Sequence, residues 1–203
     1  MLKLYYSAQS RAVRPRWLLE EIGAPYELVR LNLQAGEQKK PDYLKINPNG
    51  AVPALVDGDL ALFESAAICQ YLADKFPEKR LAPPLGTPAR ARYYQWIHYA
   101  MSGLEPPLVT LFMHTMMRPE KDRIPVLVDE ARAQITASLG VVEQALRGRK
   151  NIVGEEFSAA DVMIASTLGW ARMLNLIGQQ QPSVTSYVDA MMARPAAQRA
   201  MAD

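Results

Sequence analysis

Cysteine, histidine and long apolar runs are scarce in this sequence of 203 residues. The single cysteine, Cys69, excludes an internal disulfide, which favours a reducing compartment such as the cytoplasm. The two histidines, His98 and His114, have no further ligand at metal-binding spacing, so we expect no metal site. Neither a signal peptide nor an apolar run of the roughly 20 residues that span a membrane is visible. We therefore expect a cytoplasmic protein without a membrane partner.

An excess of charge of one sign is also lacking. The 23 lysines and arginines nearly balance the 21 aspartates and glutamates, and a net charge of +2 gives no reason to expect a nucleic-acid partner. The chain is 49% hydrophobic and 22% charged, which is typical of globular proteins. Its length allows one domain or two small ones.

Hydrophobic periodicity divides the chain into an α/β part and a helical part. Residues 1–77 predict the element order βαβ-αββα, with strands at 2–6, 26–33, 54–56 and 60–62 and helices at 12–22, 42–46 and 65–75. Prolines concentrate in the predicted linker, 78–88. Residues 89–203 predict only helices, at 89–117, 121–147, 159–174, 183–193 and 195–202, the first of them bent at Pro106 and Pro107. Ser158 and Asp161 form a capping box at the start of an apolar, buried helix.

The stretch from Asn47 to Ile68 organises the first part. Pro48 and Gly50 mark a turn, and Asp57-Gly58 is a two-residue hairpin signal. If the peptide bond before Pro53 is cis, the backbone of Val52 is free to pair with a peptide as an added strand.

The helix that follows supplies the charged ends of the same site. Ser65 is a good N-cap, the helix N-terminus attracts a carboxylate, and Glu64 can pair with an ammonium. Together with the strand edge at Val52, these features predict a site for a small zwitterionic peptide.

Val52-Pro53 followed by Glu64-Ser65-Ala-Ala-Ile resembles the glutathione-binding core of the cytosolic glutathione transferases, in particular bacterial serine-type members. The resemblance implies a thioredoxin-like N-terminal domain that binds glutathione as co-substrate and an all-α C-terminal domain that lines the electrophile site. It also implies that Pro53 is cis, that the backbone of Val52 pairs with the cysteinyl residue, and that Glu64 and Ser65 hold the γ-glutamyl end. Gly36-Glu-Gln-Lys-Lys40 is similar to a family segment G-E-H-K-K, which assigns Gln38 and Lys39 to the glycyl end.

Three hydroxyls after the first strand could donate the hydrogen bond that stabilises the glutathione thiolate. The family pattern S-x-x-[SC]-R-A-V nominates Ser7, whereas S-R-[AS]-x-R-x-x-W-L-L nominates Ser10; Tyr6 is the third candidate. Cysteine-type bacterial relatives carry their cysteine at the position of Arg11, so catalysis by an enzyme thiol is not expected. Cys69 is interpreted as a buried structural thiol.

The resemblance implies conjugation of the glutathione thiolate to small hydrophobic electrophiles, a detoxification reaction, by a homodimer with residues 65–75 and 89–117 at its interface. Alternatives are a glutathione-dependent isomerase or dehalogenase, a disulfide reductase, or a non-catalytic interaction protein of the same fold. The apolar stripe of Tyr99, Met101, Met113, Met116 and Met117 fits either an electrophile site or domain core.

Overall fold

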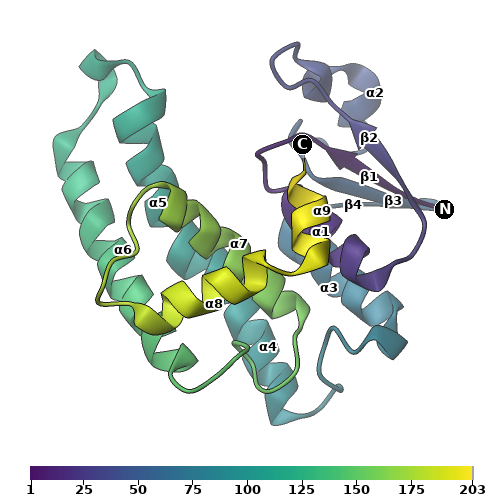
Figure 1. Ribbon diagram of the computed structural model, residues 1–203. Coiled ribbons are helices and arrows are strands. Elements are labelled where there is room, and N and C mark those ends of the chain that lie inside the picture. Colours follow the sequence, from purple (N-terminus) through teal and green to yellow (C-terminus); the bar gives the residue numbers. More distant parts are fainter. Residues whose placement is uncertain (203) are drawn as a thin grey trace. The chain divides into compact units, whose positions relative to one another are not determined.

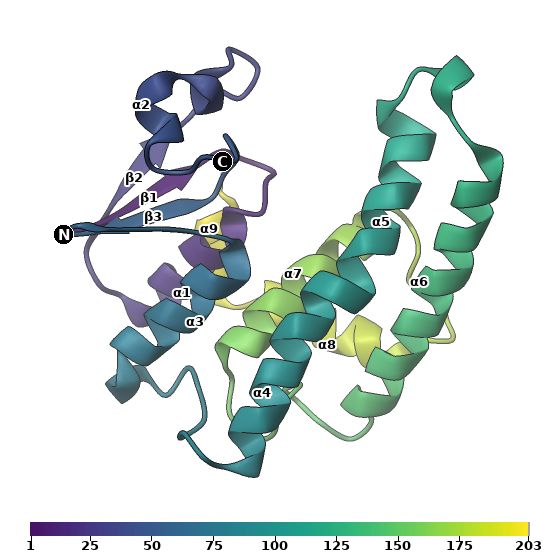
Figure 2. The ribbon, with the colours of Figure 1, turned by 180° about the vertical axis from the view of Figure 1, so that it is seen from behind.

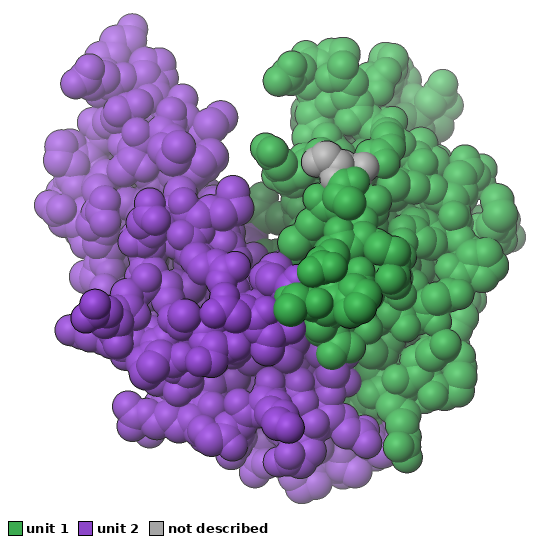
Figure 3. Space-filling view, viewed as in Figure 1, with its two compact units in different colours: residues 1–83, 193–203 green, residues 84–192 purple. Residues whose placement is uncertain are grey.

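A computed structural model of the protein describes residues 1–202, which form two compact units (Figures 1 and 3). Unit 1 comprises Met1–Pro83 together with the described residues from Ala193 onward, and unit 2 comprises Pro84–Met192. Among the described residues no helix is both long and apolar enough to cross a membrane.

Unit 1 is built on a four-stranded mixed sheet of order β2-β1-β3-β4. Its strands are β1 (Leu2–Tyr6), β2 (Tyr26–Arg30), β3 (Ala54–Asp57) and β4 (Leu60–Phe63). β2 runs parallel to β1, and the β3–β4 hairpin runs antiparallel to β1. This is the thioredoxin-like arrangement that the sequence predicts. The observed β2 is shorter than expected, because it ends at Arg30 rather than Leu33.

Helices cover both faces of this sheet (Figure 2). α1 (Val13–Ile22) and α3 (Ser65–Lys75) pack against each other on one face, and the short α2 (Pro41–Leu44) lies on the other. Leu4, Trp17 and Leu72 are fully enclosed between the sheet and these helices. The connections between these elements carry three-residue 3-10 segments at Glu37–Lys39 and Pro77–Lys79.

Two local predictions in unit 1 are corrected. The hairpin loop is Gly58-Asp59 rather than Asp57-Gly58, because Asp57 pairs with Leu60 and still belongs to β3. Ser65 is not the N-cap of α3 but its first helical residue; the cap position is Glu64, whose backbone adopts a φ of 72°.

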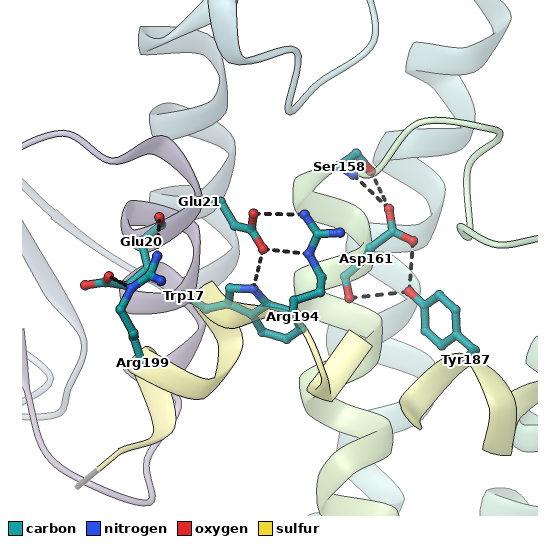
Figure 4. Close-up of polar contacts among 8 residues, drawn as sticks. All are labelled: Trp17, Glu20, Glu21, Ser158, Asp161, Tyr187, Arg194 and Arg199. Atoms are coloured by element: carbon teal, nitrogen blue, oxygen red, sulfur yellow. Dashed lines mark hydrogen bonds and ion pairs between the residues drawn. The ribbon is translucent and has the colours of Figure 1, made fainter. Parts of the chain in front are cut away.

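The last helix, α9 (Pro195–Met201), belongs to unit 1 and lies along α1. Its alanines Ala196, Ala197 and Ala200 are buried. Glu21 of α1 accepts hydrogen bonds from Arg194 Nε at 2.7 Å, Arg194 Nη2 at 2.9 Å and Trp17 Nε1 at 2.9 Å (Figure 4). The expected helical domain of residues 89–203 therefore differs from unit 2 at its end, because α9 is held by α1.

Unit 2 is entirely helical. It contains α4 (Pro88–Tyr99), α5 (Glu105–Phe112), α6 (Pro125–Leu146), α7 (Ala159–Met173) and α8 (Pro182–Met192). Two π-helical segments, Ala100–Leu104 and Met113–Met117, flank α5, and a 3-10 segment spans Glu120–Asp122.

The predicted bend at Pro106 and Pro107 takes the form of the first π-helical segment. Pro107 lacks the N–H that would bond to the carbonyl of Gly103 in a regular α-helix. The hydroxyl of Ser138 donates to that carbonyl at 2.9 Å instead. A side chain of α6, the helix that carries Ser138, therefore satisfies a backbone carbonyl of the π-helical turn before the prolines.

Helix α7 is the buried centre of unit 2, as the sequence predicts. The capping box is present, with Ser158 as N-cap and Asp161 at the third helical position. Asp161 is fully buried and accepts a hydrogen bond from Ile152 N at 2.7 Å. It also accepts from Ser158 N at 2.9 Å and Tyr187 Oη at 2.9 Å (Figure 4). One carboxylate thus joins the start of α7 to α8 and to the loop before α7.

Candidate functional site

The turn before β3 is fixed by side chains around Ala51. The carbonyl of Ala51 accepts from Tyr43 Oη at 2.6 Å and from Asn47 Nδ2 at 2.7 Å, and Asn47 Oδ1 accepts from Asn49 N at 3.1 Å. The Val52–Pro53 peptide bond is cis, as the resemblance implies. Tyr43 and Asn47 were not predicted to have this role, although an asparagine at the start of a turn is a recognisable signal.

The backbone of Val52 is left open by this arrangement. Pro53 is buried, whereas Val52 is half-buried. The β1–β3 ladder ends with the pair Tyr5 and Ala54, one step beyond Pro53. Within residues 1–202, neither the N–H nor the C=O of Val52 makes a hydrogen bond. An extended peptide can therefore add to the chain at this point.

Gln38 and Lys39 lie against the same turn. Lys39 Nζ donates to the carbonyl of Asn49 at 3.1 Å. Gly50 has a φ of 57°, and a Cβ placed there would lie 2.8 Å from Lys39 Cδ and 2.9 Å from the Gln38 carbonyl oxygen. Gln38 Nε2 donates to the Leu33 carbonyl at 3.3 Å, while its Oε1 is buried and accepts no hydrogen bond from the described residues.

The N-terminus of α3 combines an exposed carboxylate with a buried hydroxyl. Glu64 is exposed and makes no side-chain cap, so the first N–H groups of the helix lack a capping side chain. Ser65 is only 2% exposed and accepts a hydrogen bond from Arg14 Nη1 at 3.2 Å. Arg14 occupies the second arginine of the pattern S-R-[AS]-x-R-x-x-W-L-L, but sequence reasoning assigned it no role, because its partner is 51 positions away in sequence.

The loop between β1 and α1 holds two of the three hydroxyl candidates, Ser7 and Ser10, and their hydroxyls make different hydrogen bonds. Ser10 Oγ donates to the Ser7 carbonyl at 2.6 Å and accepts from Ala12 N at 3.2 Å, so it orders the loop that leads into α1. The Ser7 hydroxyl makes no hydrogen bond to any residue in the described chain. Both serines are partly exposed.

Tyr6 lies in the core of unit 1, only 2% exposed. The guanidinium carbons of Arg16 and Arg30 lie 4.8 Å and 5.7 Å from the centre of its ring. A small molecule in solution therefore has little access to this side chain.

The remaining candidate residues occupy structural positions. Cys69 is fully buried, and burial raises the pKa of its thiol to about 12 although the nearby Arg14 charge opposes this. His114 Nδ1 accepts from Ile124 N at 3.1 Å, and His98 is exposed. No group of three or more His, Cys, Asp or Glu residues within 1–202 is placed to hold a metal ion.

The predicted methionine stripe in unit 2 is only partly buried. Tyr99, Met101 and Met113 are half-buried, whereas Met116 and Met117 are 60% and 61% exposed. The last two are therefore not domain core.

Comparison with known proteins connects these features to one family. Residues 2–74 match the family model for the glutathione S-transferase N-terminal domain, and residues 104–195 match the model for the C-terminal domain. Glutathione S-transferase 3 of Zea mays is 33% identical over 99% of this chain and 93% of its own length.

Solved structures agree with this along the whole chain. A sphingomonad glutathione S-transferase complexed with glutathione superposes with a TM-score of 0.86 at 29% identity, covering 98% of this chain and 97% of that one. The glutathione transferase URE2P6 of Phanerochaete chrysosporium, in complex with oxidized glutathione, gives a TM-score of 0.88 at 29% identity over 98% of this chain and 94% of that one. The chain belongs to the glutathione S-transferase family and is a transferase.

Proposed function

We propose that the protein binds glutathione in unit 1 and transfers it, as the thiolate, to small hydrophobic electrophiles. The observation that carries the proposal is the backbone of Val52, whose N–H and C=O are not bonded to any described residue, beside the buried Pro53. A tripeptide that pairs with both backbone groups of Val52 would have its cysteinyl residue fixed at the centre of the site. Family membership makes glutathione the peptide to test.

The charged ends of glutathione find complementary groups on either side of Val52 in the sequence. We assign the γ-glutamyl end to Glu64, which can pair with its ammonium, and to Ser65 at the uncapped start of α3, which can bind its carboxylate. We assign the glycyl end to Lys39 and Gln38, whose unused Oε1 can accept from the glycyl amide.

For activation of the thiol we propose Ser7 as the hydrogen-bond donor. Ser10 already donates its only proton to the Ser7 carbonyl, whereas the Ser7 hydroxyl is not engaged by any of the described residues. Ser10 then orders the loop that presents Ser7. The buried Tyr6 takes no part in this proposal. For the second substrate we propose apolar contacts from the half-buried Tyr99, Met101 and Met113 of unit 2.

The first test is a calorimetric titration with glutathione, combined with ultraviolet absorbance of the bound thiolate as the pH is raised. Binding together with a thiol pKa below that of free glutathione is the expected result. Binding without thiolate formation would contradict the conjugation reaction, and absence of binding would contradict the whole proposal in favour of an interaction protein.

A second candidate activity is reduction of glutathione-containing disulfides. It is favoured by URE2P6, a relative of the same fold whose structure contains oxidized glutathione. In this reaction the bound thiolate attacks the glutathionyl sulfur of a mixed disulfide, forming glutathione disulfide and releasing the other thiolate. No enzyme cysteine is needed, which fits the burial of Cys69. Release of free thiol from a glutathionylated substrate would distinguish it from conjugation.

We further propose that the protein works as a homodimer in the cytoplasm, in detoxification, with α3 and residues 89–117 at the interface. The lone unpaired Cys69 supports a reducing compartment. Light scattering at several concentrations tests the dimer, and a monomeric mass throughout would contradict it.

A further inference from the structure

Arg14 is a buried cation that donates a hydrogen bond to Ser65 at the start of α3. It lies in the first turns of α1 and is only 4% exposed. Its Nη1 donates to the hydroxyl of Ser65 at 3.2 Å, and Ser65 itself is 2% exposed. Because α1 and α3 pack against each other, the contact joins two rigid helices.

The chemistry of this contact determines where the Ser65 proton points. A guanidinium can only donate hydrogen bonds, so the Ser65 oxygen must be the acceptor. A hydroxyl has one proton of its own, and the Ser65 hydroxyl donates to no acceptor within residues 1–202. A buried hydroxyl that donates no hydrogen bond is uncommon, because buried polar groups in folded proteins are normally hydrogen-bonded. The proton is therefore available to a ligand atom that accepts.

The surroundings favour a negatively charged acceptor. Ser65 is the first residue of an 11-residue helix whose N-cap side chain makes no hydrogen bond to the helix. The first backbone N–H groups of this helix therefore also require a hydrogen-bond acceptor. The positively charged guanidinium of Arg14 also contacts the Ser65 hydroxyl, at 3.2 Å. Three contributions, a helix N-terminus, an oriented hydroxyl and a buried cation, thus favour one carboxylate at this position.

We infer that Arg14 is a positioning residue for the α-carboxylate of the γ-glutamyl group: it holds Ser65 as an acceptor so that the Ser65 hydroxyl donates to that carboxylate, and its charge strengthens the bond. The inference rests on the proposed binding of glutathione. It assigns Arg14 to recognition of one end of the peptide and gives it no part in ionising the thiol.

The test measures the affinity of the full-length protein for two peptides by calorimetry. One is glutathione, and the other is 4-aminobutyryl-Cys-Gly, which lacks only the α-carboxylate. Arg14→Met should weaken binding of glutathione by about tenfold or more, because hydrogen bonds to charged groups are worth that much. It should leave the affinity for the analogue nearly unchanged, and the pKa of the bound thiol should not move.

Arg16→Met is the matched control. Arg16 is on the same helix and is similarly buried at 8% exposed, but its guanidinium stacks over the ring of Tyr6 instead of contacting Ser65. This variant should change the affinity for both peptides by the same factor. If Arg14→Met does not give a folded protein by near-ultraviolet circular dichroism, Arg14→Gln is measured by the same criterion.

The outcomes separate this inference from the proposed function. If the unmodified protein does not bind glutathione, both are wrong. If it binds, and the Arg14 variant loses affinity for both peptides equally or for neither, Arg14 has only a structural role and the inference alone is overturned.

Discussion

At the scale of single residues, Ser7 and Ser10 share a loop but differ in what their hydroxyl protons do. Ser7→Ala should raise the pKa of bound glutathione and lower kcat by about tenfold to a hundredfold, since it removes the donor that stabilises the thiolate. Ser10→Ala should mainly loosen the loop, because its proton is bonded to the Ser7 carbonyl at 2.6 Å. Ultraviolet absorbance of the bound thiolate as a function of pH measures the pKa of bound glutathione in each variant. A raised pKa in Ser10→Ala alone would establish Ser10 as the donor.

Gly50 illustrates how a residue without a side chain can position a charged one. Gly50→Ala should lower the free energy of unfolding by about 1–3 kcal/mol and also weaken glutathione binding, because the new Cβ would displace Lys39. The added Cβ at position 50 would lie 2.8 Å from Lys39 Nζ. Chemical denaturation and calorimetry measure the two effects.

Gly58→Ala is the control for that substitution. Gly58 has a φ of 60°, close to the 57° of Gly50, but a Cβ there would meet nothing within 4 Å. It should lose stability through backbone strain and retain its affinity for glutathione. Equal loss of affinity in both variants would contradict the placement of Lys39.

Residues of the candidate site could be proposed from sequence only where their signals are local. Val52-Pro53 and Glu64-Ser65 are contiguous motifs, so each can be recognised from neighbouring residues alone. The link from Arg14 to Ser65 spans 51 positions and depends on how two helices pack, so no spacing reveals it. The N-cap position of α3 was predicted one residue too late, because serine is a preferred cap residue whereas Glu64 occupies the cap position without capping the helix through its side chain.

At the scale of elements, α1 and α9 are joined by two arginine–carboxylate pairs. Arg194 bonds to Glu21 through two nitrogens, and Arg199 Nε bonds to Glu20 at 2.7 Å (Figure 4). Arg194→Ala should lower the free energy of unfolding by about 1–2 kcal/mol, a value discounted because the Arg194 side chain is partly exposed. Arg172→Ala, which removes a surface pair with Asp189, should cost less than about 0.5 kcal/mol. Equal losses in urea unfolding would contradict a structural role for α9.

The same contacts predict how stability depends on pH. Burial acts to raise the pKa of the Glu21 carboxyl, but hydrogen bonds from Arg194 and Trp17 outweigh it, so the pKa lies below its ordinary value of 4.5. Glu20 is lowered in the same way by Arg199 and Tyr26. A lowered pKa in the folded state stabilises the protein above the ordinary value, and this contribution is lost as the pH falls through the folded-state pKa.

The stability difference between the unmodified protein and Arg194→Ala should therefore be full at neutral pH and shrink below pH 4.5. Thermal unfolding of both proteins across this range measures it. A difference that stayed constant down to low pH would show that Arg194 acts through packing alone.

Element types were predictable to a greater degree than element ends. Apolar periodicity and the box from Ser158 to Asp161 predicted α7 closely, because caps and amphipathic faces are local properties. The π-helical turn at Ala100–Leu104 was predicted only as a bend. The Gly103 carbonyl in this turn accepts a hydrogen bond from the hydroxyl of Ser138, which comes from another helix and has no local sequence signature.

At the scale of the whole molecule, the chain leaves unit 1 after Pro83, builds the helices of unit 2, and returns to unit 1 at Ala193. Sequence patterns predicted a simple succession of two domains, because residues 195–202 read as one more short helix. Nothing within α9 specifies its partner, since Arg194 and Glu21 are 173 positions apart. The fold order came from periodicity and from the family resemblance, whereas membership of a unit is decided by packing.

Because of this connectivity, unit 1 includes α9, which packs against α1. Ala197→Asp would bury a carboxylate where α9 meets the rest of unit 1, because Ala197 is fully buried, and should displace the helix at a cost of several kcal/mol, roughly 3 or more. Hydrogen exchange should then increase in α1 while α6 and α7 keep their protection. Gln198→Asp, on the exposed side of the same helix, should leave exchange unchanged. Loss of protection in α7 as great as in α1 would contradict the prediction that the effect is confined to unit 1.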